Sequence, residues 1–114
     1  MKSISCLALL LLTSAPALAN AHLIKSSPAN GARVRSPSRI TLTFSEALEP
    51  AFSGALLLDE DGRNWTADPV KIDGPILRLL PSQRLPPGLY MVSWHSVGHE
   101  GRRVDGHFRF TVGP

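Results

Sequence analysis

The sequence predicts a small all-β protein, an antiparallel β-sandwich of the Greek-key type with about seven strands. Three observations support this prediction: short runs of alternating apolar and polar residues, turn residues that separate these runs at regular spacing, and no convincing helical periodicity after residue 21. The 10 prolines fit as well, because most of them lie at the ends of the proposed strands. Many unrelated functions share this fold class, so the fold alone does not indicate an activity.

The individual strands follow from the positions of the apolar residues. In the clearest run, RITLTFS, Ile40, Leu42 and Phe44 share one face and the two threonines share the other. The turn sequence at Asp59–Gly62 makes the segment after it the expected hairpin partner of the run before it. In chain order, the expected strands are His22–Ser26, Arg39–Ser45, Phe52–Leu58, Arg63–Ala67, Ile76–Leu80, Leu89–Val97 and His107–Val112.

Residues 1–21 are typical of a cleaved secretory signal peptide. Lys2 supplies a positive start, residues 4–12 are almost entirely apolar, and Pro16 precedes the small residues of a cleavage site. The apolar run is well short of the roughly 20 residues that a membrane span needs. Cys6, the only cysteine, leaves with this segment, so the mature domain is expected to fold on its core alone, without metal or disulfide.

Two overlapping Ala-x-Ala triplets, Ala17–Ala19 and Ala19–Ala21, are candidate cleavage signals. A cut after the second leaves residues 22–114, or 114 − 21 = 93 residues, as one domain that begins with His22. A cut after the first leaves Asn20-Ala21-His22 at the N-terminus. Without Lys2, the 12 basic residues become 11 against 9 acidic ones, and they are scattered, so the sequence does not favour nucleic acid as a partner.

Four segments carry a distinctive set of motifs, in the order HLIKSSPANGARV, ITLTFSEALEPAFSGALLL, LPPGLYMVSWHSV and GHFRFTV. The most specific are a histidine followed by S-x-P-x-x-G, the phrase FSE-x-L-x-x-x-F-S-G, and the strand from tyrosine to tryptophan. From His22 to the C-terminus, the chain resembles the CopC family of periplasmic copper-resistance proteins. The resemblance implies an Ig-like β-sandwich that binds copper in the periplasm and passes it on.

The resemblance also implies that His22 is the first residue of the mature protein, which favours the cut after Ala21. The α-amine and Nδ1 of one histidine can close a chelate ring on Cu(II), an ion that prefers nitrogen-rich tetragonal sites. The amine, with an ordinary pKa of about 8, loses its proton to the metal at modest cost. After the alternative cut, the sequence Asn20-Ala21-His22 can also bind Cu(II), through its amine, backbone amides and imidazole, but in a tail.

The loop GHEGRRVDG departs from the pattern that the family implies, which is an Asp-x-His pair that completes the Cu(II) site. Counted without a change of length, Glu100 takes the place of the aspartate and Arg102 the place of the histidine. The glutamate can still offer a carboxylate oxygen, whereas an arginine stays protonated and cannot be a ligand. One expected imidazole is therefore missing.

Three histidines are candidates for that imidazole. His99 lies beside Glu100 between two glycines, so a small twist of the loop would bring its ring to the metal. His107 belongs to a displaced Asp-x-His, Asp105–His107, but is expected to be held in the last strand. His95 contributes only if its strand face borders the site. For each of them the alternative is a structural or solvent-facing histidine, and for His95 that alternative is favoured.

Two further residues bear on the site. The resemblance places Glu46 near the amine of His22, where its carboxylate would orient that nitrogen from behind the metal ligands; the alternative is a strand-end glutamate in water. Met91 is the only methionine besides the initiator, and one thioether does not make the methionine-rich Cu(I) site of some family members. We therefore expect one Cu(II) site and no separate Cu(I) site.

The leading hypothesis is a copper-binding carrier or buffer of the periplasm, a monomer and not an enzyme, with an inner-membrane copper transporter as a possible partner. A metal-free interaction module, whose site has decayed through Arg102, is the first alternative. A copper oxygenase with an N-terminal histidine brace is the second, but 93 residues leave little surface for a polysaccharide (114 − 21 = 93).

Overall fold

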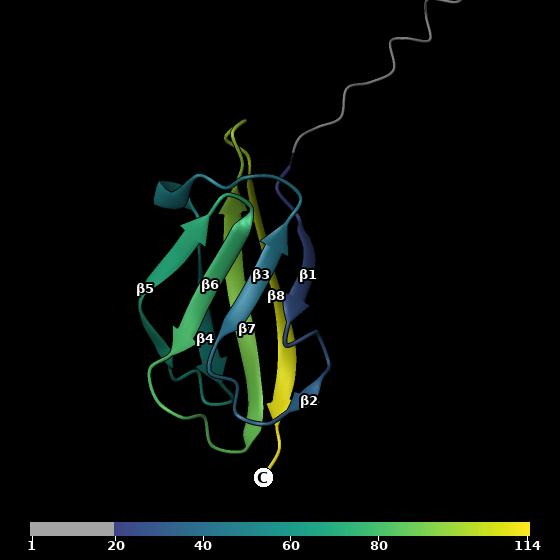
Figure 1. Cartoon of the computed structure of the whole chain (residues 1–114), viewed down its shortest axis with the longest axis vertical. Coiled ribbons are helices and arrows are strands. Elements are labelled where there is room, and N and C mark those ends of the chain that lie inside the picture. The colour runs from purple at the N-terminus through teal and green to yellow at the C-terminus, as the bar shows by residue number, and fades with distance from the viewer. Residues whose placement is uncertain (1–19) are drawn as a thin grey trace, which may run out of the picture.

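The computed structural model describes residues 20–114, which form two four-stranded β-sheets packed face to face (Figure 1). The predicted all-β sandwich is confirmed. Of the predicted signal peptide, all but Asn20 and Ala21 lies outside the described residues. The eight strands are β1 (Leu23–Ser27), β2 (Arg33–Val34), β3 (Ile40–Phe44), β4 (Gly54–Asp59), β5 (Thr66–Asp73), β6 (Ile76–Pro81), β7 (Gly88–Val97) and β8 (Arg103–Val112).

The first sheet has the strand order β1-β3-β6-β5. β1 runs antiparallel to β3, with Leu23 opposite Phe44. This pairing brings His22, just before β1, beside Ser45, just after β3, and the amide of Ser45 donates to the carbonyl of His22 at 2.8 Å. The register of two strands therefore places the predicted N-terminal ligand against the FSE motif.

The second sheet has the strand order β2-β8-β7-β4. β7 and β8 form a hairpin in unbroken register from Gly88 opposite Val112 to Val97 opposite Arg103, which leaves residues 98–102 as its loop. β8 therefore begins at Arg103, before the predicted start at His107. Gly106 hides this extension in the sequence, because it lies opposite Trp94 and any side chain there would overlap the indole.

β2 is the strand that the sequence did not predict. It has only two residues and pairs in parallel with the end of β8, with Arg33 opposite Thr111. Two residues are too few to show an alternation of apolar and polar side chains, so only the pairing with β8 identifies this strand.

The core lies between the sheets and has the inward faces that alternation predicted. Ile40, Leu42 and Phe44 of β3 are buried, and the ring of Phe44 meets Trp94 of β7 edge to face at 5.1 Å between centroids. Tyr90 stacks on Phe110 of β8 at 5.8 Å. Such aromatic pairs stabilise the fold beyond the area that they bury, by about 0.5–1.5 kcal/mol each.

The predicted hairpin between residues 63–67 and the preceding run forms only over its first residues. The amide of Asp59 donates to the carbonyl of Arg63 at 3.1 Å, Asn64 bridges to Leu58, and the amide of Trp65 donates to the carbonyl of Leu57 at 2.7 Å. From Thr66 on, β5 pairs with β6 of the other sheet. The side chain of Asp59 stabilises this turn, because it accepts hydrogen bonds from the amide of Arg63 and from Nε1 of Trp65, both at 2.9 Å. The buried indole of Trp65 belongs to the core.

Phe52 was also expected in a strand, and it instead ends the short 3-10 helix η1 (Pro50–Phe52). Proline suits the first turn of a helix because its φ is already helical and its missing N–H is not needed there. β4 accordingly begins at Gly54. Phe52 remains exposed on the surface.

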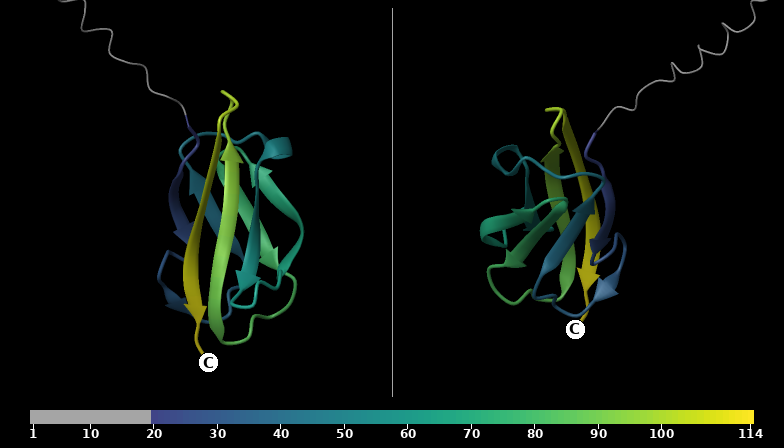
Figure 2. Two further views of the ribbon diagram at one scale, coloured as in Figure 1. Left: turned by 180° about the vertical axis from the view of Figure 1, so that it is seen from behind. Right: turned by 45° about the horizontal axis from the view of Figure 1, so that its top comes forward.

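Three segments meet at one end of the sandwich, as Figures 1 and 2 show: the start of the described chain, the β3–β4 connection with η1, and the β7–β8 loop. The C-terminus, β2 and the β6–β7 connection lie at the other end. Within residues 20–114, no helix is both long and apolar enough to span a membrane.

Candidate metal site

His22 lies exposed at the end where the three segments meet, and both of its relevant nitrogens contact the same hydroxyl group. Its backbone N–H donates to Ser45 Oγ at 3.0 Å, and its Nδ1 lies 3.2 Å from that oxygen. The two nitrogens therefore face the same side of the residue. That arrangement is what a chelate ring on one metal ion requires.

Asn20 occupies the remaining space beside these nitrogens. Its carbonyl oxygen lies 3.2 Å from His22 Nδ1 and accepts a hydrogen bond from Ser45 Oγ at 3.1 Å. A metal ion bound to Nδ1 would have to displace this carbonyl. The residues before His22 thus decide whether the imidazole is free.

Glu46 and His99 form the second part of the site. Nδ1 of His99 lies 3.6 Å from Oε1 of Glu46, and the side chains are 72% and 22% exposed respectively. Oε2 of Glu46 is buried and has no hydrogen-bond partner among the described residues. A carboxylate oxygen without a donor is costly to bury, so this atom favours a donor or a cation as its partner in the working protein.

The backbone of Gly98 makes room for this carboxylate, because any side chain at that position would overlap Oε2 of Glu46. Gly101 closes the turn by donating to the carbonyl of Gly98 at 2.9 Å, and its φ of 81° is the left-handed conformation that favours glycine. The two glycines that the sequence places around the candidate ligands therefore shape the loop that carries them.

Glu100 and Arg102 are exposed on this loop. Neither side chain makes a hydrogen bond or an ion pair with another residue of the described range 20–114. Glu100 is thus on the same loop as His99, and the guanidinium of Arg102 leaves an electrically positive group where the family pattern implies an imidazole.

His107 lies away from this loop, on the outer face of β8 opposite Ser93. The neighbouring Asp105 is engaged by Arg103 at 3.0 Å. The displaced Asp-x-His is therefore part of a regular strand, as the sequence suggested, and the structure does not bring it to His22.

His95 lies on the same outer face, in β7 opposite Asp105. It is half-buried, and its ring leans over Gly54 of β4. Burial, helped by the charge of Arg103, lowers the pKa of its imidazole and keeps the ring neutral. This environment supports the structural role that was favoured for His95.

Taken together, the described part of the chain contains no group of three histidine, cysteine or acidic side chains that converges as a ready metal site. What it contains is a pair of nitrogens on His22 and, from neighbouring segments, the Glu46–His99 pair. Two nitrogen donors on one side of a histidine fit Cu(II). To complete a set of metal ligands, the side chains on the β7–β8 loop must move toward His22.

Two residues that organise this end of the protein, Ser45 and Ser96, were not predicted from the sequence, and Asn20 was predicted only as part of a possible N-terminal tail, not as a residue packed against the domain. Ser96 is 0% exposed, and its hydroxyl donates to the carbonyl of Ala21. A signal was present, because Ser96 continues the inward positions of Tyr90, Val92 and Trp94, where a polar residue needs a partner. For the contact between Ser45 and Asn20, no local sequence pattern predicts the pairing.

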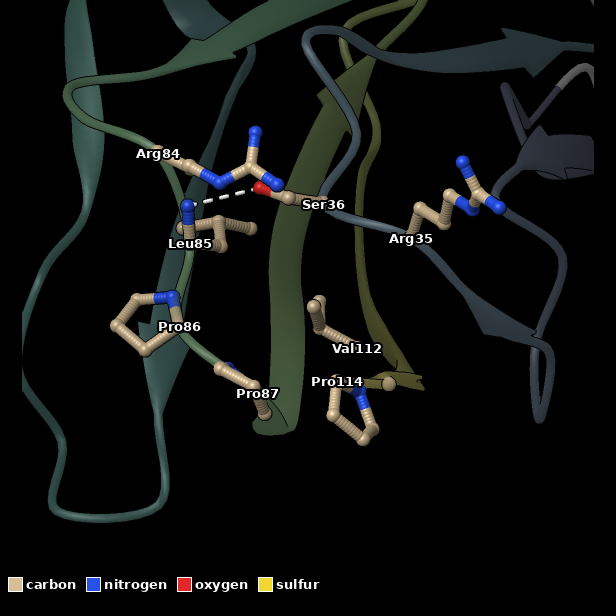
Figure 3. Close-up of a pocket in the computed structure, with 9 residues that line it drawn as sticks. Arg35, Ser36, Arg84, Leu85, Pro86, Pro87, Val112 and Pro114 are labelled. Atoms are coloured by element: carbon tan, nitrogen blue, oxygen red, sulfur yellow. Dashed lines mark hydrogen bonds between the residues drawn. The ribbon is translucent and has the colours of Figure 1, made fainter.

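A pocket at the opposite end of the molecule contains none of the candidate ligands (Figure 3). Arg35 and Arg84 line it together with prolines, and Ser36 fixes one wall by accepting a hydrogen bond from the amide of Leu85 at 2.9 Å. Its lining offers no imidazole and no carboxylate side chain, so it does not suit a copper ion.

Comparison with known proteins relates the whole folded domain to copper proteins. Residues 23–113 match the family model described as CopC domain. Protein YobA of Escherichia coli strain K12 is 39% identical over 98 residues, which cover 82% of this chain and 79% of YobA. Copper resistance protein C of Xanthomonas campestris pv. juglandis is 34% identical over 109 residues, covering 89% and 86% of the two chains.

The fold agrees with that relationship. The crystal structure of PcoC, a methionine-rich copper resistance protein from Escherichia coli, superposes with a TM-score of 0.72 at 32% identity, over 82% of this chain and 99% of PcoC. The family match spans nearly all of the described residues, and relatives above 30% identity align over most of their own length. The chain therefore belongs to the CopC family, and its function is related to copper.

Proposed function

We propose that this chain is a periplasmic Cu(II) carrier or buffer whose metal is anchored by the backbone nitrogen and Nδ1 of His22. One observation carries the proposal: both nitrogens contact Ser45 Oγ, at 3.0 and 3.2 Å, so a single ion can replace that contact and bind both. The copper-related names of the relatives support the choice of metal. No catalytic role is proposed.

The chelate ring is the same for either way of processing the leader. After the predicted cut behind Ala21, the nitrogen of His22 is an amine, which gives up its proton readily. After a cut behind Ala19, it is an amide, which Cu(II) must deprotonate as it binds. The Asn20 carbonyl that now faces Nδ1 is lost with the leader after the cut behind Ala21. After the cut behind Ala19 it has to turn away, because it occupies a ligand position.

The remaining ligands in this proposal come from the β7–β8 loop. His99 supplies a second imidazole and Glu100 a carboxylate oxygen, after the loop between Gly98 and Gly101 turns toward His22. Glu46 stays behind the ligands and orients the His22 nitrogen with its buried oxygen, as the absence of a partner for Oε2 within the described chain suggests. His107 is the reserve ligand and would require a different register of β8.

One Cu(II) site and no separate Cu(I) site are proposed, because Met91 alone cannot provide a set of thioether ligands. The proposed protein is a monomer that receives or delivers its ion at the exposed end of the sandwich. An inner-membrane copper transporter is the proposed partner.

The test is a Cu(II) titration of exported protein against a competing chelator. His22→Ala should lower the affinity by at least on the order of a hundredfold, because even indirect partners of metal ligands are worth about 10- to 100-fold. One extra residue placed before a mature protein that starts at His22 should also weaken binding, since it converts the α-amine into an amide whose proton Cu(II) must displace. His99→Ala should have a smaller effect and remove one nitrogen coupling from the electron paramagnetic resonance spectrum.

His107→Ala is the matched control, an exposed histidine on the outer face whose loss should leave affinity unchanged. If affinity depends on His107 alone, the displaced Asp-x-His is the true site. If His22→Ala binds copper as well as the natural protein, the proposed site is wrong. The metal-free interaction module, which Arg102 and the lack of three converging ligands among residues 20–114 favour, then takes its place.

A further inference from the structure

The two residues before His22 are packed into the domain. Ala21 is 0% exposed and belongs to the hydrophobic core. A residue that is destined for removal has no reason to fill a core position, because its loss leaves a cavity in the folded protein.

Ser96 holds Ala21 in that position. It is 0% exposed, and its hydroxyl donates to the carbonyl of Ala21, 75 residues away in the sequence. Cleavage between Ala21 and His22 would remove this acceptor and leave a fully buried hydroxyl without its hydrogen bond. Buried hydroxyls that lose a partner destabilise a fold, so Ser96 would be a poor choice for a domain that starts at His22.

Asn20 is also bound to the domain. Its carbonyl oxygen accepts from Ser45 Oγ at 3.1 Å, and its Oδ1 is buried without a partner among the described residues.

We infer that the mature protein keeps Asn20 and Ala21, so that its N-terminus is the folded tripeptide Asn20-Ala21-His22. Cleavage then uses the first triplet, Ala17–Ala19. This cleavage site replaces the cut after Ala21 that the sequence predicts. What it implies for copper binding rests on the proposed function. Ser96 becomes a positioning residue, which fixes the tripeptide through the carbonyl of Ala21.

The consequence for copper is a different set of nitrogens. A free terminus with histidine third offers the α-amine of Asn20, the amides of Ala21 and His22, and the imidazole Nδ1. To bind in this way, the Asn20–Ala21 peptide must turn, because its carbonyl oxygen and not its nitrogen now lies beside Nδ1. Cu(II) displaces the protons of the amine and of the two amides into solvent, and four nitrogens around one ion fit its tetragonal preference. No imidazole from the β7–β8 loop is then needed. The arginine at position 102 no longer implies a decayed site.

The first experiment is an intact-mass measurement of the full-length precursor after export. A mature protein that begins at Asn20 supports the inference, and one that begins at His22 overturns it. The measurement needs no metal, so it is independent of the proposed copper site.

The second experiment compares two purified chains, residues 20–114 and residues 22–114, by thermal unfolding in the presence of a chelator. The longer chain should unfold several degrees higher. Ser96→Ala should lower the midpoint of the longer chain and have a much smaller effect on the shorter one, which lacks the acceptor. Ser93→Ala, on the outer face of the same strand, is the matched control and should behave alike in both. Equal losses for Ser96→Ala in the two chains would contradict its proposed role.

Electron paramagnetic resonance of the copper-loaded exported protein separates this inference from the proposed function. Four nitrogen couplings that survive His99→Ala support the tripeptide site. A coupling that disappears with His99→Ala overturns it in favour of the loop ligand. In either case His22→Ala must abolish the spectrum of the bound ion, and its persistence would instead refute the copper site at His22.

Discussion

Two carboxylates at opposite ends of the sandwich differ in how their oxygens are satisfied. Oδ1 of Asp59 accepts from the amides of Asp61 and Arg63, and its Oδ2 accepts from Nε1 of Trp65, all at 2.9 Å. Glu46 has only His99 at 3.6 Å, and its Oε2 is buried without a partner in the described chain.

We propose that this difference separates a structural carboxylate, Asp59, from a functional one, Glu46. The hydrogen bonds from Trp65 and from the amide of Arg63 lower the pKa of Asp59 below its ordinary value, and they close the turn that leads the chain into the first sheet. Every bond of Asp59 is made within the folded domain. Glu46 lacks such bonds. A buried carboxylate oxygen without a donor is expected where the binding partner is a bound ion or a chain terminus produced by cleavage.

The largest expected effect is on Cu(II) affinity, at the end of the sandwich that carries Glu46 and His99. Arg102→His supplies the imidazole that the family pattern implies, so Cu(II) affinity should rise by at least on the order of tenfold, given that even indirect partners contribute about 10- to 100-fold. Competition titration and one additional nitrogen coupling in the spectrum would show it. Arg109→His, on the outer face of β8, is the control. An unchanged affinity would mean that position 102 does not border the copper ion.

The next effect is steric. Gly98→Ala should push the Glu46 carboxylate out of its place, because a Cβ there overlaps Oε2. We expect a loss of stability of about 1–3 kcal/mol, typical of overpacking, together with weaker copper binding. Gly62→Ala, at the other end, meets no atom but has a φ of 80°, so it should lower stability without touching copper affinity. If the two variants changed Cu(II) affinity equally, the proposed difference between the Glu46 end and the Asp59 end would be wrong.

Asp59→Asn should lower the midpoint of thermal unfolding at pH 7 and leave copper affinity unchanged. Folding lowers the pKa of Asp59, so its negative charge stabilises the fold at every pH above the ordinary pKa of 3.8. This contribution is lost as the pH falls toward the lower pKa of the folded state. The stability difference between the natural protein and the variant should therefore shrink below about pH 4. A difference that is constant with pH would show that charge is not involved.

The smallest expected effect is on stability at Glu46. Glu46→Gln keeps the shape of the side chain, loses no hydrogen bond of Oε2 and removes a charge that is buried without a donor, so the free energy of unfolding should stay the same or rise slightly. Copper affinity should nevertheless fall. A large loss of stability in denaturant unfolding would make Glu46 a structural residue like Asp59.

Most of the fold could be predicted because alternation is a local property. Ile40, Leu42 and Phe44 announce one face of β3, and Phe108 and Phe110 one face of β8, whatever their partners are. The prediction failed beyond Trp65, where a non-local pairing decides the path. From Thr66 on, the chain pairs with β6 of the other sheet and no longer with β4.

The candidate site could be predicted only as a set of residue types. The sequence by itself determined that a histidine stands at position 22, that the FSE motif ends a strand, and that the loop has a glutamate and an arginine where the resemblance implies Asp-x-His. Through the resemblance to the CopC family, these residues and spacings indicate copper before any contact of His22 is known.

Only the tertiary structure decided which atoms meet. Ser45 contacts His22 from 23 residues away, Glu46 faces His99, and Ser96 reaches Ala21 across 75 residues. Such contacts depend on the register of β1 on β3 and on how one sheet lies over the other. Period-2 alternation fixes the face on which a side chain lies but not the residue opposite it in the other sheet, so the burial of Ala21 is visible only in the folded chain.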